Sequence, residues 1–395
     1  MKKEPTVPAV VVGGTLNGLG VVRSLVGGGM PIFVLDTGRR CAAAWSRFCH
    51  FVPSPTLEGP GLIRTLCQLA TQVASRPVLF LTGDQSVDTV SAHRSTIESR
   101  YRISLPHAEM VSTLADKALF HSLAERERLA VPRTVSISTR ADISQIWDLV
   151  PPLVLKPADK KLEIKGVVER AVAVGSAGEA HAVAKKMLRT APKIVVQEWI
   201  EGPDTEIFFT LFSCNRQSEI IALFVGRKLV CAPPAVGSTA ACMAAPEVAE
   251  ELCATTRKFV SRVGYCGLGS LEFKRDGRTG CFLIIEPTVG RTDWQEEIAT
   301  LCGVNLPLLT YWAELNRPAP NPALQKSVAW RSSAAFRVPA EFLGKGVPVI
   351  DGYLRWTDPA PALFHYGYER VALRIWNRLA SWITPEPIET RVAEE

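Results

Sequence analysis

The sequence lacks the patterns typical of membrane-spanning, zinc-binding and secreted proteins. No stretch approaches the ~20 consecutive apolar residues that span a bilayer, although 47% of the residues are apolar. The ten cysteines lie far apart with no C-x-x-C pair, which argues against zinc and thioredoxin-like motifs. An acid, two prolines and then glycines follow the first two lysines, so the start does not resemble a signal peptide. We therefore expect a cytoplasmic protein with reduced cysteines and no stable membrane insertion.

Charge and length narrow the class of protein further. The net charge is +6 and is spread along the chain, without the basic and aromatic alternation of a nucleic-acid groove. The sequence contains no internal repeat and no low-complexity segment. At 395 residues the chain is long enough for two or three domains, each with its own core. We expect small-molecule partners and no nucleic acid.

The predicted strands and helices divide the chain into three parts. Up to about residue 113, strands, a glycine turn and helices alternate, which is typical of a doubly wound α/β unit. The next 200 residues carry short, closely spaced strands that favour antiparallel pairing, after a single predicted helix between residues 112 and 132. From residue 325 onward, tryptophans recur and prolines interrupt, which indicates a docked appendage. A helix predicted at 368–382 is expected to pack on its own domain, with binding to a membrane surface as the alternative.

A glycine-rich turn from Val10 to Gly20 joins the first strand to the first helix. Such a turn can present backbone N–H groups to an anion. Asp36 ends the second strand, at about the distance where dinucleotide-binding folds place a ribose-binding acid. The glycines do not keep the G-x-G-x-x-G spacing, so a nicotinamide-dependent oxidoreductase and a purely structural turn both remain open.

Charged residues also stand at strand ends in the middle of the chain. A lysine that ends a buried strand, as in PLVLKP, must either extend to solvent or meet an anion. The segment VVQEWIEGPDTEIF then combines polar backbone with an acid beyond a Gly-Pro turn, which suits a purine and a ribose. The candidates are Lys117, Lys156, Glu198, Trp199, Ile200, Asp204, Arg227 and Lys228.

The most informative pattern is a predicted hairpin late in the chain. Its strands, LGSLEFKR and CFLIIEP, each carry one acid, Glu272 and Glu286, on either side of an Asp-Gly turn. Side chains two residues apart share a strand face, so Glu286 and Thr288 point together. Two carboxylates and a hydroxyl form the oxygen-rich set that Mg²⁺ prefers when it bridges ATP phosphates. Structural ion pairs with Lys274 or Arg291 are the alternative, but the convergence of the three groups favours the metal.

The order of these motifs resembles the ATP-grasp superfamily, and within it the carboxylate-amine ligase branch that includes D-aspartate ligase and the large-chain domains of carbamoyl phosphate synthetase. The resemblance covers roughly residues 7–320 and includes the phrases LPHAEMVSTLADKALF and FVGRKLVCAPPAVGS. It implies an α/β and α+β chain with the ATP-grasp fold. The implied parts are a doubly wound pre-ATP-grasp domain at 1–113, a lid subdomain at 114–200, a catalytic subdomain at 201–324 and an appendage at 325–395.

The resemblance also implies a function. Such ligases use ATP with one or two Mg²⁺ ions, or Mn²⁺, to convert a carboxylate into an acylphosphate that an amine attacks, releasing ADP and phosphate. A catalytically weak or inactive ATP-binding regulatory protein is the alternative, because Thr288 stands where the family usually has Asn and Arg291 is displaced from the family's arginine position. The basic segment at 158–166 is expected to be a mobile lid over the phosphates. The sequence is compatible with a homodimer.

The resemblance assigns a role to each candidate. For the nucleotide, Lys117 and Lys156 would contact phosphates, Glu198 and Ile200 on either side of Trp199 would offer backbone groups to adenine, and Asp204 would take the ribose. For the reaction, Lys228 or Arg227 would meet the γ-phosphate or the substrate carboxylate, and Arg291 would assist catalysis. Glu272, Glu286 and Thr288 would hold Mg²⁺.

Overall fold

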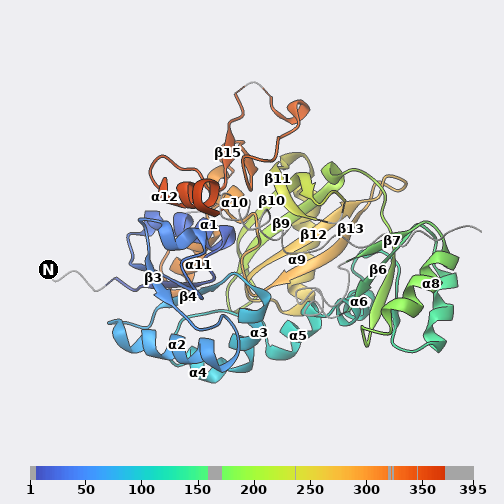
Figure 1. Ribbon diagram of the computed structural model, residues 1–395, viewed down its shortest axis with the longest axis horizontal. Helices are drawn as coiled ribbons and strands as arrows, with labels where there is room; N and C mark the ends of the chain where they lie inside the picture. The colour runs from blue at the N-terminus through green and yellow to red at the C-terminus, as the bar shows by residue number, and fades with distance from the viewer. Residues whose placement is uncertain are drawn as a thin grey trace, which may run out of the picture.

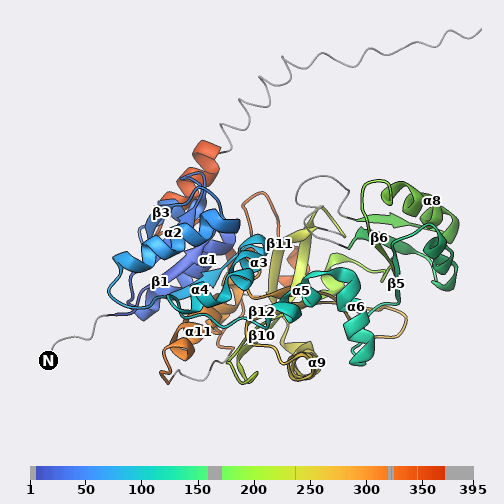
Figure 2. The same cartoon turned by 90° about the horizontal axis from the view of Figure 1, so that it is seen from below.

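The strands of this computed structural model form three sheets. Two have four strands, in the orders β3-β2-β1-β4 and β5-β8-β6-β7, and one has seven, in the order β13-β12-β9-β10-β11-β14-β15. Figures 1 and 2 agree that the seven-stranded sheet lies between the other two. Among the residues that the structure describes, no helix is long and apolar enough to cross a bilayer. The structure describes residues 6–158, 171–235, 237–318, 322, 324–344 and 346–369.

The N-terminal unit is a parallel sheet covered by helices. All four residues of β1 are buried, as expected for a parallel strand with both faces covered. The edge strand β3 is only half-buried and short, which explains why its sequence, HFVP, gave no strand signal. The elements are β1 (Ala9–Val12), α1 (Leu16–Leu25), β2 (Ile32–Asp36), β3 (His50–Pro53), α2 (Gly59–Gln72), β4 (Val78–Leu81), α3 (Asp84–Ala92) and α4 (Arg94–Glu98).

The segment predicted to form one helix between residues 112 and 132 forms two, so that prediction is wrong. The carboxylate of Asp116 accepts hydrogen bonds from the N–H groups of Ala118 and Leu119, at 2.8 and 2.9 Å. A side chain that caps a new helix in this way ends the old one, because the capping residue itself has an extended backbone. The two helices are α5 (Ala108–Ala115) and α6 (Lys117–Arg126).

A small antiparallel sheet follows α6. Its inner face packs on helices through buried Ile, Leu and Val side chains such as Ile137, Leu155 and Val196. Residues 159–166 of the predicted lid lie outside the described residues. The elements are β5 (Thr134–Ile137), the 3-10 segment η3 (Ala141–Asp148), β6 (Leu153–Pro157), β7 (Val172–Val174), α8 (Ala177–Met187) and β8 (Ile194–Glu198).

The seven-stranded sheet forms the centre of the molecule. Every residue of β9 is buried, because neighbouring strands flank it and helices cover it. The sheet contains β9 (Ile207–Cys214), β10 (Ile220–Ala232), β11 (Ser238–Ala244), β12 (Gly267–Arg275), β13 (Phe282–Val289), β14 (Ala329–Arg331) and β15 (Val349–Asp351), with helices α9 (Ala249–Val263), α10 (Glu297–Cys302) and α11 (Leu306–Glu314).

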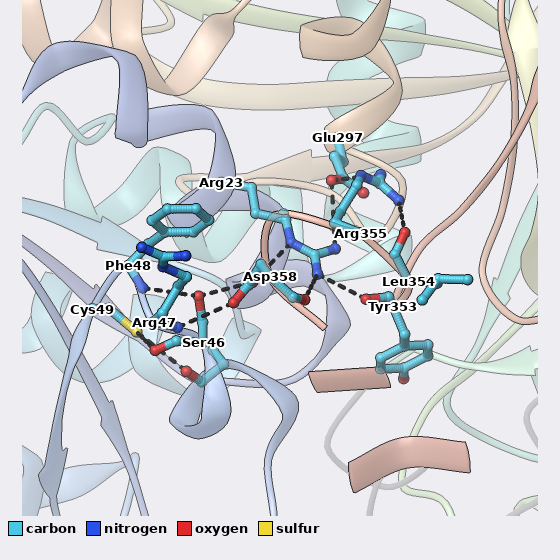
Figure 3. A network of polar contacts seen from close by, with 12 residues as sticks. Arg23, Ser46, Arg47, Phe48, Cys49, Glu297, Tyr353, Leu354, Arg355 and Asp358 are labelled. Atoms are coloured by element: carbon cyan, nitrogen blue, oxygen red, sulfur yellow. Dashed lines mark hydrogen bonds and ion pairs between the residues drawn. The ribbon is translucent and has the colours of Figure 1, made fainter. Parts of the chain in front are cut away.

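The described part of the C-terminal region is docked through buried charges (Figure 3). Asp358 is 1% exposed and accepts hydrogen bonds from Ser46 Oγ at 3.0 Å, Arg47 N at 3.1 Å and Arg23 Nε at 3.3 Å. Arg355 Nη2 lies 2.8 Å from Glu297 Oε1 at the start of α10. These contacts tie the region to α1 and α10. It ends with α12 (Ala360–Ala362) and the π-helix η7 (Leu363–Glu369); beyond Glu369 the helix predicted at 368–382 lies outside the described residues.

Replacing Asp358 with alanine should lower the free energy of unfolding by about 3 to 5 kcal/mol, because it leaves the buried Arg23 guanidinium without its closest carboxylate. Guanidinium chloride unfolding measures the change. The control is Glu98→Ala, which removes a partly exposed i,i+4 pair with Arg94 and should cost no more than about 0.5 kcal/mol. Equal losses in the two variants would contradict the structural role of the buried network.

Candidate active site

A cavity of about 470 Å³ lies where the three sheets meet. Its lining includes Thr82 beyond β4, Val154 of β6 and Ile285 of β13, so the N-terminal unit, the small sheet and the large sheet each form a wall. The structure brings all but two of the assigned candidates, Asp204 and Arg227, to this cavity. Lys117, Lys156, Glu198, Trp199, Ile200, Lys228, Glu272, Glu286, Thr288 and Arg291 line it.

The two acids of the hairpin stand directly opposite each other on β12 and β13. The register pairs Glu272 with Glu286, and Phe273 with Ile284. Ile285 is therefore an extra residue on β13, which makes a β-bulge of the kind that redirects side chains next to active sites. The bulge brings Glu286 level with Glu272. Thr288 lies two residues further along the same strand and also faces the cavity.

A buried lysine neutralises one of these acids. Lys228, from β10, is 4% exposed, and its Nζ lies 2.5 Å from Glu272 Oε2. Burial is the largest single influence and lowers the pKa of Lys228, but the charge and hydrogen bond of Glu272, together with other nearby acidic groups, raise that pKa overall, so the lysine stays cationic. The neighbouring Arg227 points to the other strand face, where it pairs with Glu247 at 3.2 Å. Of the two cations considered for the reacting groups, the cavity therefore contains Lys228.

Lys274 and Arg291, the two cations considered as structural partners of these acids, make close contacts elsewhere. Lys274 Nζ donates to the carbonyl oxygens of Gly202 and Pro203, at 2.8 and 2.7 Å. Burial lowers the pKa of Lys274. Arg291 forms a two-pronged pair with Asp84, from Nε at 2.5 Å and from Nη2 at 3.2 Å. Lys274 thus fixes the turn after β8, and Arg291 joins the large sheet to the start of α3.

The segment after β8 offers backbone groups to the cavity. The N–H groups of Glu198 and Trp199 donate to Arg133 O at 2.9 Å and Pro152 O at 2.8 Å. Within the described residues no such bond is found for the N–H of Ile200, although this residue is buried and lines the cavity. A buried N–H needs a partner. Ile200 therefore has a donor available for a ligand, as the adenine prediction requires.

Asp204 is the second candidate, after Arg227, that does not line the cavity. Its Oδ2 accepts from Cys231 N at 2.8 Å, and its Oδ1 accepts from Ala235 N at 2.9 Å. These bonds fasten the end of β10 and the turn that follows it. The ribose contact assigned to Asp204 stays a prediction, and in the structure both oxygens of this carboxylate accept backbone hydrogen bonds.

The wall formed by the N-terminal unit contains residues that motif reasoning did not assign. Asn17 donates to Thr82 O at 3.2 Å and Thr292 O at 3.0 Å, so it joins the first βα turn to the loop after β13. Asp84, at the start of α3, pairs with Arg291, and no sequence motif joins these two residues. Asp36 accepts from Gly14 N at 2.7 Å, which gives this acid a structural role in the glycine turn.

The donor chemistry of the cavity fits magnesium bound together with phosphates. No group of three or more His, Cys, Asp or Glu residues suited to a metal is found in the described part of the chain. Magnesium does not need such a cage, because it commonly takes one or two carboxylates and completes its shell with phosphate oxygens and water. Glu272, Glu286 and Thr288 supply only oxygen ligands.

Comparison with solved structures identifies the class of fold. The chain resembles N5-carboxyaminoimidazole synthetase from Staphylococcus aureus in complex with ADP, with a TM-score of 0.64, 14% identity, and coverage of 83% of this chain and 82% of that chain. It also resembles an L-amino acid ligase from Bacillus licheniformis, with a TM-score of 0.57, 14% identity, and coverage of 81% and 76%. The chain has the ATP-grasp fold, and the predicted resemblance is confirmed.

Comparison with curated proteins points to a particular relative. D-aspartate ligase from Enterococcus faecium (strain Aus0004) is 21% identical over 334 residues, which cover 78% of this chain and 76% of that protein. No family model matches the chain.

A further structural neighbour is the biotin carboxylase domain of the Hydrogenobacter thermophilus 2-oxoglutarate carboxylase, solved with MgADP and bicarbonate. It has a TM-score of 0.64 and 13% identity, and the match covers 81% of this chain and 73% of that chain.

Proposed function

We propose that the protein is an ADP-forming ATP-dependent ligase that joins a small-molecule carboxylate to an amine. The observation that carries the proposal is the register of β12 and β13, which sets Glu272 opposite Glu286 beside the cationic Lys228. The likeness to D-aspartate ligase and to the L-amino acid ligase supports the same class of reaction. Both proteins are named as ligases.

The proposed reaction has two steps. A carboxylate oxygen of the substrate attacks the γ-phosphorus of ATP, the bond from that phosphorus to the bridging oxygen breaks, and ADP leaves. The amine nitrogen then attacks the acylphosphate carbon, phosphate leaves, and the nitrogen loses a proton. No nucleophilic side chain is required, so the protein contributes positioning and charge neutralisation.

The side chains of the cavity divide these tasks. Lys117 and Lys156 would offset the charge of the polyphosphate, and Ile200 would donate its N–H to the adenine. Lys228 would stabilise the charge of the transferring phosphoryl group. Glu272, Glu286 and Thr288 would hold magnesium, which when bound neutralises charge on the phosphate oxygens. Arg291 would meet the substrate carboxylate near the wall formed by the N-terminal unit.

The alternative is an ATP-binding protein with little turnover, and the observation that favours it is Thr288 in place of the usual Asn. Measuring ADP and phosphate release over a panel of carboxylates and amines, amino acids included, separates the two. The ligase predicts MgATP-dependent ADP release that needs both substrates. MgADP binding with no turnover on any pair would favour the alternative, and absence of nucleotide binding would contradict both.

A further inference from the structure

Helix α6 carries a buried histidine one turn after a proposed phosphate-binding lysine. Lys117 and His121 are four residues apart, so they lie on the same face of the helix. His121 is 6% exposed, and its Nδ1 has no hydrogen-bond partner among the described residues. Keeping an unsatisfied ring nitrogen in the interior is unfavourable. Packing alone therefore does not account for a histidine at this position.

The other ring nitrogen of His121 contacts a glutamine that in turn contacts the second phosphate lysine. His121 Nε2 lies 2.9 Å from Gln197 Nε2, whose amide also donates to Thr134 Oγ1 at 3.1 Å. Gln197 Oε1 accepts from Lys156 Nζ at 3.4 Å. An amide nitrogen only donates, so the imidazole Nε2 must accept. Burial, together with nearby Lys156, lowers the pKa of His121 to about 4, which keeps the ring neutral and able to accept.

Two further contacts join α6 to the small sheet at the same place. The N–H of Lys117 donates to Ala158 O at 3.2 Å, just beyond the end of β6. Ala118, Ala158 and Val195 form a small buried cluster beneath it. The bond between His121 and Gln197 thus adds a side-chain link between the helix that carries Lys117 and the sheet that carries Lys156.

We propose that His121, acting through Gln197, is a positioning residue that fixes the separation of Lys117 and Lys156 and so shapes the binding site for the nucleotide polyphosphate. This inference rests on the proposed function. His121 does not line the main cavity and contacts it through Gln197, which in turn contacts Lys156. The inference therefore concerns only the phosphate end of the nucleotide.

The test compares nucleotides that differ in phosphate number. His121→Met keeps the size of the side chain but removes the acceptor, and His121→Gln restores an acceptor oxygen. By calorimetry we expect His121→Met to bind MgATP and MgADP about tenfold more weakly, the scale of one lost buried hydrogen bond. Its affinity for AMP should change less than about twofold. His121→Gln should recover most of the loss. The control, His181→Met, changes a histidine of α8 outside the cavity lining and should bind like the wild type.

Each other outcome is decisive. An equal loss for AMP, MgADP and MgATP would overturn the proposal, because His121 would then support the adenine end. Unchanged MgATP affinity in His121→Met would overturn it as well. If His121→Met does not fold, Gln197→Met removes the same link, and the same dependence on phosphate number is required. If the wild type binds none of the nucleotides, the proposed function fails first, which is distinguishable from failure of the inference alone.

Discussion

Replacing Glu286 with alanine or glutamine should abolish ADP formation and leave the fold intact. Glu286 faces the cavity directly opposite Glu272, and the pairing of β12 with β13 is made by backbone groups that the substitution keeps. Removing one electrostatic contact to a transferring phosphoryl group costs on the order of a hundredfold in rate, and loss of the metal costs more. A coupled assay of ADP release measures the effect, and circular dichroism checks the fold.

A matched substitution separates this effect from a general loss of charge. Glu250→Gln, on the exposed first turn of α9, makes the same chemical change at a residue outside the cavity lining and should keep wild-type turnover. In Glu286→Gln, magnesium should no longer strengthen ADP binding. Wild-type turnover in Glu286→Ala would refute the metal role of this acid.

Replacing Lys228 with methionine should also lower the rate of ADP formation by about a hundredfold or more. The reason differs from that for Glu286, because Lys228 supplies positive charge beside Glu272 and binds no metal. Methionine fills the same volume, and the side chain of Glu272 is 31% exposed, so the fold should tolerate the change. Magnesium should still strengthen ADP binding in this variant, which distinguishes it from Glu286→Gln.

The adjacent residue supplies the control for Lys228. Arg227 pairs with Glu247 on the opposite strand face and lies over the ring of Phe208, 4.5 Å from its centroid. Arg227→Met should keep turnover within about twofold of the wild type, since surface-pair losses act on stability and are small. If Lys228→Met were active and Arg227→Met inactive, the contact with the transferring phosphoryl group would belong to Arg227 and not to Lys228.

Apolar runs predicted much of the fold. The runs that became β6, β8, β9 and β10 were recognised from the sequence because they are rich in Val, Ile, Leu and Phe. β11 was missed, since its sequence STAACMA is made of small residues and pairing with β10 and β14 keeps it in the sheet. The break at Asp116 was missed because a capping acid and an ordinary surface acid look alike in sequence.

The residues of the site were easier to name than their partners. Glu272 and Glu286 stood out because acids are rarely buried among apolar strand residues, although both lie within their strands, which continue to Arg275 and Val289. Their exact opposition depends on the bulge at Ile285, and a one-residue shift in register leaves no mark in composition. The pair between Asp84 and Arg291 joins residues 207 positions apart. Asp204 looked like a ligand-binding acid, yet its backbone partners appear only in the folded chain.

The central claim is that Glu272 and Glu286 together grip a divalent ion that is itself bound to the nucleotide. The most direct measurement is a crystal structure with Mn²⁺ and a non-hydrolysable ATP analogue, using anomalous scattering to locate the metal. We predict a peak between the two carboxylates and in contact with phosphate oxygens. Nucleotide bound in the cavity with the metal elsewhere, or with no metal between these acids, would contradict the account.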